Sequence, residues 1–255
     1  MTVSTEPSSG DVVDGEQRRA GRELVLELVF RPLSNPLVAA LARAHVAPTA
    51  VVLANAATGL IAAVALARGQ LAAAAALLQV KTLLDNTDGR LARATRRVTL
   101  TGRYLDTEAD LVVNAAIFAA LAYVTGEPVL AVLAFVALTI VLAVDFNVTE
   151  LYREAYGSAV RMPPATGEPT ERVLTWIYGL VFGTLDGAIR RLLRRDAIDR
   201  LTVNVLANLG LSTQLAVLGV CLVVGAPEAY LWIVFACVPL VAGLLIRMEL
   251  RARSS

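Results

Sequence analysis

Long apolar segments separated by short polar loops dominate this chain and limit the folds that it can adopt. Of its 255 residues, 56% are hydrophobic. Six segments are each long enough to cross a hydrocarbon core of about 30 Å as a helix rising about 1.5 Å per residue. They lie at residues 48–67, 70–92, 102–124, 128–149, 203–224 and 228–246. The pattern predicts an all-α, polytopic membrane protein with six transmembrane helices.

Basic residues are distributed unevenly among the predicted loops. Of the 23 basic residues, 22 are Arg, and Lys81 is the only lysine. The loops near residues 68, 125–128 and 225–228 contain almost no basic residue, whereas the loops on the other side are rich in Arg. By the positive-inside rule, this asymmetry predicts an integral protein of the cell membrane with both termini on the cytoplasmic side. A formal net charge of +1 gives no indication of a nucleic-acid partner.

Two further segments mix apolar and charged residues and are not expected to span the membrane. Residues 21–44 and 171–195 fit amphipathic helices that lie on the cytoplasmic face. The expected organisation is a disordered cytoplasmic tail over 1–16, an amphipathic juxtamembrane segment over 17–46, and a six-helix transmembrane domain over 47–250. A cytoplasmic interfacial insertion interrupts that domain at about 155–200.

Four acidic residues lie in or beside the second and third apolar segments. They occur in the pattern Asp85-x-x-Asp88-Gly89-x-x-Ala92-Arg93, eight further residues, then Gly102-x-x-x-Asp106-x-x-x-Asp110. Each pair of acids is one helical turn apart, so two facing helices would bring four carboxylates together. Such a cluster needs cations to neutralise it, and oxygen ligands favour Mg²⁺ or Mn²⁺. Because His45 is the only histidine and precedes the first span, a general base here would be a carboxylate.

These residues resemble the signature of the CDP-alcohol phosphotransferase (CDP-alcohol phosphatidyltransferase) family, DxxDGxxAR, eight residues, GxxxDxxxD. Every signature position and the spacing are met. The resemblance implies that two Mg²⁺ or Mn²⁺ ions bind to Asp85, Asp88, Asp106 and Asp110 and hold the diphosphate of a CDP-linked substrate. It also implies that the nucleotide lies near Gly89, Ala92, Arg93 and Gly102.

The resemblance further implies a phosphotransferase reaction in phospholipid biosynthesis, with residues 47–250 as the catalytic domain. Asp110 would act as the general base that accepts the proton of a hydroxyl acceptor, and CMP would leave. The expected donor is a CDP-linked lipid, most simply CDP-diacylglycerol, and the expected assembly is a homodimer within the membrane lipids. The active site would face the cytoplasm.

Other functions are open at this point. Transfer of a choline- or ethanolamine-type group from a CDP-alcohol onto diacylglycerol breaks the same bond. An intramembrane prenyltransferase would need two widely separated acidic motifs, and a cation transporter would need acids at several depths of the membrane. These two are less consistent with four acids inside 26 residues.

Several polar residues outside the signature also need an explanation. Lys81 precedes Asp85 by one turn, which favours a counter-ion for Asp85 or a snorkelling side chain over a phosphate ligand. Leu111 stands where relatives that use inositol phosphate commonly have a basic residue, which argues against that acceptor. An acceptor pocket is expected to draw on polar residues of the third to fifth spans, namely Asn114, Asp145, Asn147, Glu150, Arg153, Asn204 and Asn208.

Overall fold

The computed structural model describes residues 21–156, 165–193 and 197–254. Within these ranges it is helical and contains no β-strand, which confirms the all-α class. The predicted tail over 1–16 and parts of the predicted insertion lie outside the described residues. The proposed domain boundaries therefore stay predictions.

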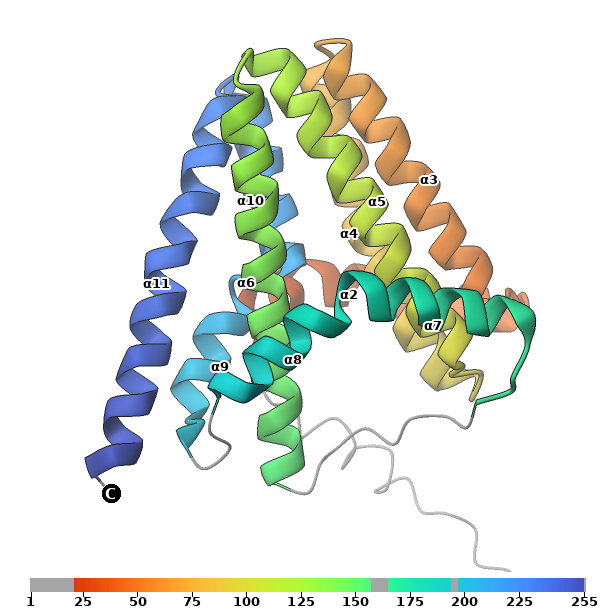
Figure 1. The fold of residues 1–255 in the computed structure, drawn as a ribbon. Helices are drawn as coiled ribbons and strands as arrows, with labels where there is room; N and C mark the ends of the chain where they lie inside the picture. The colour runs from red at the N-terminus through yellow and green to blue at the C-terminus, as the bar shows by residue number, and fades with distance from the viewer. Residues whose placement is uncertain (1–20, 157–164, 194–196, 255) are drawn as a thin grey trace, which may run out of the picture.

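Long helices form the body of the molecule (Figure 1). Five of them are continuous: α3 (Pro48–Ala67), α4 (Leu71–Ala94), α5 (Leu100–Thr125), α6 (Pro128–Ala155) and α11 (Pro227–Ser254). A further long segment is a bent pair of helices, in which α9 (Arg200–Ala207) meets α10 (Leu211–Val224) at an angle of 40°. Each predicted span thus coincides with a helix or with this bent pair.

Not all of these long helices are apolar enough to be identified as membrane spans. In the described part of the chain, α3, α5, α6 and α11 qualify, and the α9–α10 pair is a fifth span if its two helices cross as one. Helix α4 does not qualify because Lys81, Asp85, Asp88 and Arg90 interrupt its apolar surface. A membrane protein is supported, while the number of six spans stays a prediction.

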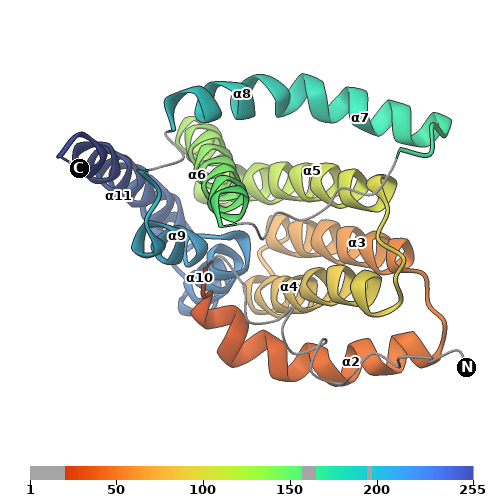
Figure 2. The same ribbon diagram turned by 90° about the horizontal axis from the view of Figure 1, so that it is seen from below.

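Shorter helices lie across two sides of the bundle, near the end that carries the acidic residues. The π-helix η1 (Leu26–Phe30) continues into α2 (Arg31–Arg43), which packs against α4. On the opposite side, α7 (Pro169–Val181) packs against α5, and α8 (Gly183–Leu192) packs against α6 (Figure 2). The predicted amphipathic helix over 171–195 is therefore two helices with a break at Phe182.

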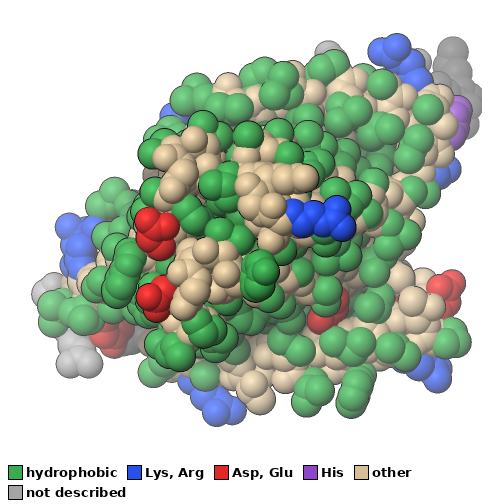
Figure 3. Space-filling view, turned by 90° about the horizontal axis from the view of Figure 1, so that it is seen from above, with side chains coloured by type: hydrophobic (Ala, Val, Ile, Leu, Met, Phe, Trp, Pro, Cys, Tyr) green, Lys and Arg blue, Asp and Glu red, His purple; other side chains and the backbone are tan. Residues whose placement is uncertain are grey.

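Helix ends follow from local sequence. Proline begins α3 and α6, where its missing N–H is not needed by the helix. The Thr99 hydroxyl caps α5 by accepting a hydrogen bond from the Gly102 N–H. At the opposite end, Gly126 and Gly225 adopt positive φ angles of 72° and 79° and stop α5 and α10. That end of the bundle presents a largely hydrophobic and neutral surface with few charged groups (Figure 3).

Helix α3 holds the two motif helices in place, because it packs against both α4 and α5. Gly59 makes the close approach possible: a Cβ there would lie 2.4 Å from Val113 Cγ1 on α5 and 3.2 Å from Lys81 Cδ on α4. Buried aliphatic side chains, including Leu66, Leu78 and Leu121, fill the space further toward the Arg-poor end. The acidic motif thus sits at the opposite end of this packed interior.

Candidate active site

The acids of the motif come together from two helices. Asp85 and Asp88 lie one turn apart on α4, and Asp106 and Asp110 lie one turn apart on α5. One carboxylate oxygen from each of Asp85, Asp88 and Asp106 lies within 4.8 Å of the others. We call these three residues the acid triad. The predicted four-acid cage is therefore a triad with Asp110 as its neighbour.

The triad has the properties of a divalent cation site. Asp88 Oδ2 and Asp106 Oδ1 are buried, and neither atom accepts a hydrogen bond from any residue that the structure describes. Asp85 Oδ1 accepts a hydrogen bond of 3.0 Å from Asn55 Nδ2 on α3. Buried carboxylate oxygens without donors are costly unless a cation compensates them. The donor set, entirely oxygen, fits Mg²⁺ or Mn²⁺.

Asp110 forms a close ion pair with a buried lysine. Its Oδ1 lies 2.7 Å from the Lys81 ammonium, which is also 3.9 Å from Asp85 Oδ1. The sequence spacing favoured Asp85 as the partner of Lys81, but the approach of α5 supplies the nearer carboxylate. Lys81 is completely buried.

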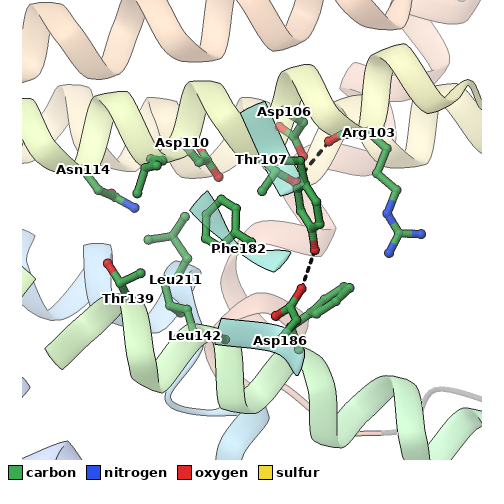
Figure 4. Close-up of a pocket in the computed structure, with 14 residues that line it drawn as sticks. Arg103, Asp106, Thr107, Asp110, Asn114, Thr139, Leu142, Phe182, Asp186 and Leu211 are labelled. Carbon is green, nitrogen blue, oxygen red and sulfur yellow. Dashed lines mark hydrogen bonds between the residues drawn. The ribbon is translucent and has the colours of Figure 1, made fainter. Parts of the chain in front are cut away.

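A cavity of about 210 Å³ lies next to Asp106 and Asp110 (Figure 4). One side is polar and includes Thr107 and Asn114 of α5, together with Thr139 of α6. Two further charged residues, Arg103 of α5 and Asp186 of α8, also line it. The other side chains are apolar or aromatic and come from α5, α6, α7, the α7–α8 break and α10: Leu111, Leu142, Ala143, Phe146, Tyr178, Phe182 and Leu211. A ligand in this cavity would contact both the acids and an apolar wall.

Helices α7 and α8 close one side of the cavity through a hydrogen-bond chain. The Tyr178 hydroxyl donates to Asp186 Oδ2 at 2.8 Å, and Asn147 Nδ2 of α6 donates to Asp186 Oδ1 at 2.7 Å. Arg190 Nε in turn donates to Asn147 Oδ1 at 2.9 Å. Burial and the hydrogen bond to Asp186 raise the pKa of Tyr178 above its ordinary value, so it stays a neutral donor.

The sequence did not identify Tyr178 and Asp186 as site residues. The available signal was weak: Asp186 directly follows an apolar run, and Tyr178 is one of three aromatic residues inside that run. An amphipathic surface helix explains such a pattern equally well without a site. The packing of α7 against α5 brings Tyr178 to the cavity, and the packing of α8 against α6 brings Asp186 there.

The remaining motif residues lie near the α4–α5 connection. The Gly102 N–H caps α5 with Thr99, and a Cβ at Gly102 would lie 3.1 Å from Thr99 Oγ1, so this glycine has a structural use of its own. A Cβ at Gly89 would lie 3.5 Å from the guanidinium of Arg93, which is exposed. Ala92 is half-buried. Their predicted contacts with a nucleotide stay predictions.

Of the polar residues expected to line an acceptor pocket, Asn114 does so. Asn204 and Asn208 instead bind the backbone of the N-terminal segment: Asn204 Oδ1 accepts from the Arg22 N–H at 3.0 Å, and Asn208 Oδ1 accepts from the Leu24 N–H at 2.9 Å. Asn147 holds Asp186, as described above, and Glu150 pairs with Arg153 at 2.9 Å. These groups have structural partners in place of a ligand.

Comparisons with known proteins point to one family. Residues 45–240 match the model of the family described as CDP-alcohol phosphatidyltransferase. A curated relative, the "Bifunctional IPC transferase and DIPP synthase" of Thermococcus kodakarensis, is 33% identical over 112 residues, which is 42% of this chain and 26% of the relative. The chain therefore matches about a quarter of that relative's length. The family match includes the acid triad, Lys81, Asp110 and the whole cavity lining.

Proposed function

Because the chain belongs to the CDP-alcohol phosphatidyltransferase family, and is therefore an enzyme that transfers a phosphate-linked group from a CDP-alcohol, we propose that it forms a phospholipid. The proposed donor is CDP-diacylglycerol. A hydroxyl acceptor attacks the phosphorus distal to cytidine, the bond from that phosphorus to the CMP oxygen breaks, and CMP leaves with the bonding electrons.

The observation that carries this proposal is the position of the acid triad beside the cavity. Asp106 belongs to the triad and also lines the cavity, so a diphosphate held at the triad would have its reacting phosphorus at the cavity. Bound Mg²⁺ or Mn²⁺, of which we propose two, would neutralise the diphosphate and polarise its oxygens. Asp85, Asp88 and Asp106 would hold these ions, and the family resemblance adds Asp110 as a fourth ligand.

Asp110 is the proposed general base. It lines the cavity on the α5 side, next to Asn114, and so faces the space where an acceptor hydroxyl would lie (Figure 4). Its carboxylate would take the hydroxyl proton as the new phosphorus–oxygen bond forms. The apolar part of the cavity lining would limit access of water to this step and so disfavour hydrolysis of the donor.

The wider setting of the enzyme is also proposed. The Arg-rich loops support a cytoplasmic position for the triad and both termini, on the side of the cell membrane where a nucleotide-linked donor would be available. Nucleotide binding near Gly89, Ala92, Arg93 and Gly102 and assembly as a homodimer rest on the family resemblance.

The test is metal-dependent release of CMP by the purified protein in lipid or detergent. CDP-diacylglycerol is offered with glycerol 3-phosphate, inositol phosphate, inositol, serine or phosphatidylglycerol as the acceptor. We expect release with one acceptor, a loss of about 100-fold or more in Asp110→Asn, and near-normal rates in Glu108→Gln. Glu108 is a matched control because it is a buried acid of α5 outside the triad and the cavity lining. If no acceptor leads to CMP release, and the protein also binds neither CMP nor Mn²⁺, the proposal is rejected.

A further inference from the structure

Lys81 lies completely buried in the middle of α4. Its aliphatic stem passes between α3 and α5 at the point where α3 has Gly59, and a Cβ on that glycine would lie 3.2 Å from Lys81 Cδ. A flexible, strongly hydrated side chain is rarely enclosed in this way unless its charge is paired. The packing around Lys81 therefore directs its ammonium to one place.

That place is the junction between the two halves of the motif. The ammonium lies 2.7 Å from Asp110 Oδ1 on α5 and 3.9 Å from Asp85 Oδ1 on α4. Asp85 Oδ1 also accepts the hydrogen bond from Asn55 Nδ2, so this oxygen is fixed from α3 as well. One positive charge thus touches a triad acid and the proposed base together.

The charge count explains why the arrangement is stable. Four carboxylates would repel one another strongly in a partly buried site, since Coulomb energies rise as the local dielectric constant falls. An ammonium between Asp85 and Asp110 offsets one negative charge and reduces their mutual repulsion. Asp88 and Asp106 keep buried oxygens that have no donor among the described residues, so the demand for further cations lies in the triad.

We propose that Lys81 is a positioning residue of the active site: a fixed internal cation that orients Asp110 toward the cavity and leaves the triad to bind the divalent ions. The role of Asp110 in this proposal rests on the proposed function. The charge balance between Lys81, Asp85 and Asp110 does not, because it follows from the contacts alone.

The first experiment measures thermal stability of the full-length protein in detergent, with EDTA or with Mn²⁺. Lys81→Met should melt well below the wild type in EDTA, because it leaves an uncompensated carboxylate. The rise in its melting temperature on addition of Mn²⁺ should be about twice that of the wild type or more, because the acidic cluster is more negative without the ammonium. In the double variant Lys81→Met/Asp110→Asn, the loss in EDTA should be clearly smaller than the sum of the two single losses.

Gln79→Met is the matched control. Gln79 lies on α4 two residues before Lys81, and its Nε2 donates to the Leu215 carbonyl at 3.2 Å, away from the acids. This variant should lose stability that Mn²⁺ does not restore beyond the wild-type shift. If Lys81→Met responds to Mn²⁺ as Gln79→Met does, and the double variant is additive, Lys81 only fills space and the proposal is overturned.

The second experiment measures CMP release. Lys81→Met should lower kcat by about 100-fold, while the KM for the CDP-linked donor changes little, because a misdirected base slows chemistry more than binding. Lys81→Arg, which keeps the charge, should recover part of kcat. A change in KM alone would contradict the positioning role. If the wild type releases no CMP, the proposed function fails while the stability measurements still decide the charge balance; if Lys81→Met does not fold, Lys81→Gln replaces it in both experiments.

Discussion

At the scale of single residues, the two orphaned carboxylate oxygens of Asp88 and Asp106 are the most informative atoms of the molecule. Folded proteins rarely bury a charged acceptor without a donor or a cation. Their position within one triad shows that the fold brings together a demand for positive charge. Neither helix alone would produce this demand.

Asp88→Asn tests whether the triad binds the ion. At about 100 times its Kd, a bound ion stabilises the folded state by about 2.7 kcal/mol, and a 100-fold weaker affinity leaves about 0.4 kcal/mol. We therefore expect Mn²⁺ to raise the melting temperature of the wild type and to have almost no effect on Asp88→Asn. Glu108→Gln should respond as the wild type does. An unchanged response in Asp88→Asn would remove Asp88 from the metal site.

The sequence predicted the acids of the site but not all of their partners. The motif spacing placed Asp85, Asp88, Asp106 and Asp110 on facing helices, and the triad agrees with that expectation. Local spacing also assigned Lys81 to Asp85, one turn away. The nearer partner, Asp110, is 29 positions away in sequence, and such a contact depends on how α5 approaches α4.

At the scale of helices, the length of the apolar segments predicted the long helices but not where a helix is broken or where it ends. The predicted span over 48–67 coincides with α3, whereas the one over 203–224 is broken between Ala207 and Leu211. Hydropathy does not report backbone direction, so a bend that keeps the sequence apolar is invisible to it. Likewise α6 continues to Ala155, past the predicted end at 149, because polar residues extend a helix beyond the membrane without changing its geometry.

Gly59→Ala tests the packing of α3 against its two neighbours. The new methyl group would lie 2.4 Å from Val113 Cγ1, closer than carbon atoms can approach, so α3 and α5 must separate. Overpacking of this kind costs about 1–3 kcal/mol of folding stability, which thermal or denaturant unfolding in detergent would measure. Gly243→Ala on α11 is the control, since a Cβ there has no neighbour within 4 Å in the described part of the chain. Equal stability of the two variants would contradict the close approach.

Asp199 links α9 to α11 and makes stability depend on pH. Partial burial would raise the pKa of Asp199, but the hydrogen bonds from Thr202 and the charges of Arg247 and Arg251 outweigh it, so the pKa lies below its ordinary value. A lowered pKa in the folded state means that the stabilisation is present above the unfolded value of about 3.9 and is lost as pH falls through the folded value.

The corresponding prediction concerns Asp199→Asn. Its melting temperature should be lower than that of the wild type at pH 7, and the difference should shrink as the pH falls below about 4. Melting curves of both proteins between neutral and acidic pH would measure this. The Asp199→Asn variant keeps the oxygen that accepts from the Thr202 N–H, so the cap is retained in the variant. A difference that stays constant over the range would show that the charge of Asp199 contributes nothing to the pH dependence.

At the scale of the whole molecule, the arrangement of the helices was beyond the sequence. Helix α3 has no motif residue, yet it packs on both motif helices, and its Asn55 donates a hydrogen bond to Asp85 of the triad. Helices α2 and α7–α8 lie on opposite sides of the bundle (Figure 2). Residues of α7 and α8 line the cavity, whereas none of α2 does. Amphipathic patterns predict that such helices lie on a surface, but not which groove they cover.

The orientation in the membrane gives a prediction for the entire molecule. In a cysteine-free background, Glu127→Cys should react with a membrane-impermeant maleimide added to intact cells, because its loop is predicted to face outward. Arg97→Cys should react only after the membrane is opened. Both wild-type side chains are exposed, so access within the protein does not limit either reaction. The reverse pattern would place the triad on the outer side.

The enclosure of Lys81 has a practical consequence. It carries the only side-chain amine in the chain, and this amine is completely buried. An acylating reagent can therefore modify it only while the helices around it are apart, and mass spectrometry would follow that modification at one known position. The rate of this modification would report how often the bundle opens, and a ligand that holds the helices together would lower that rate.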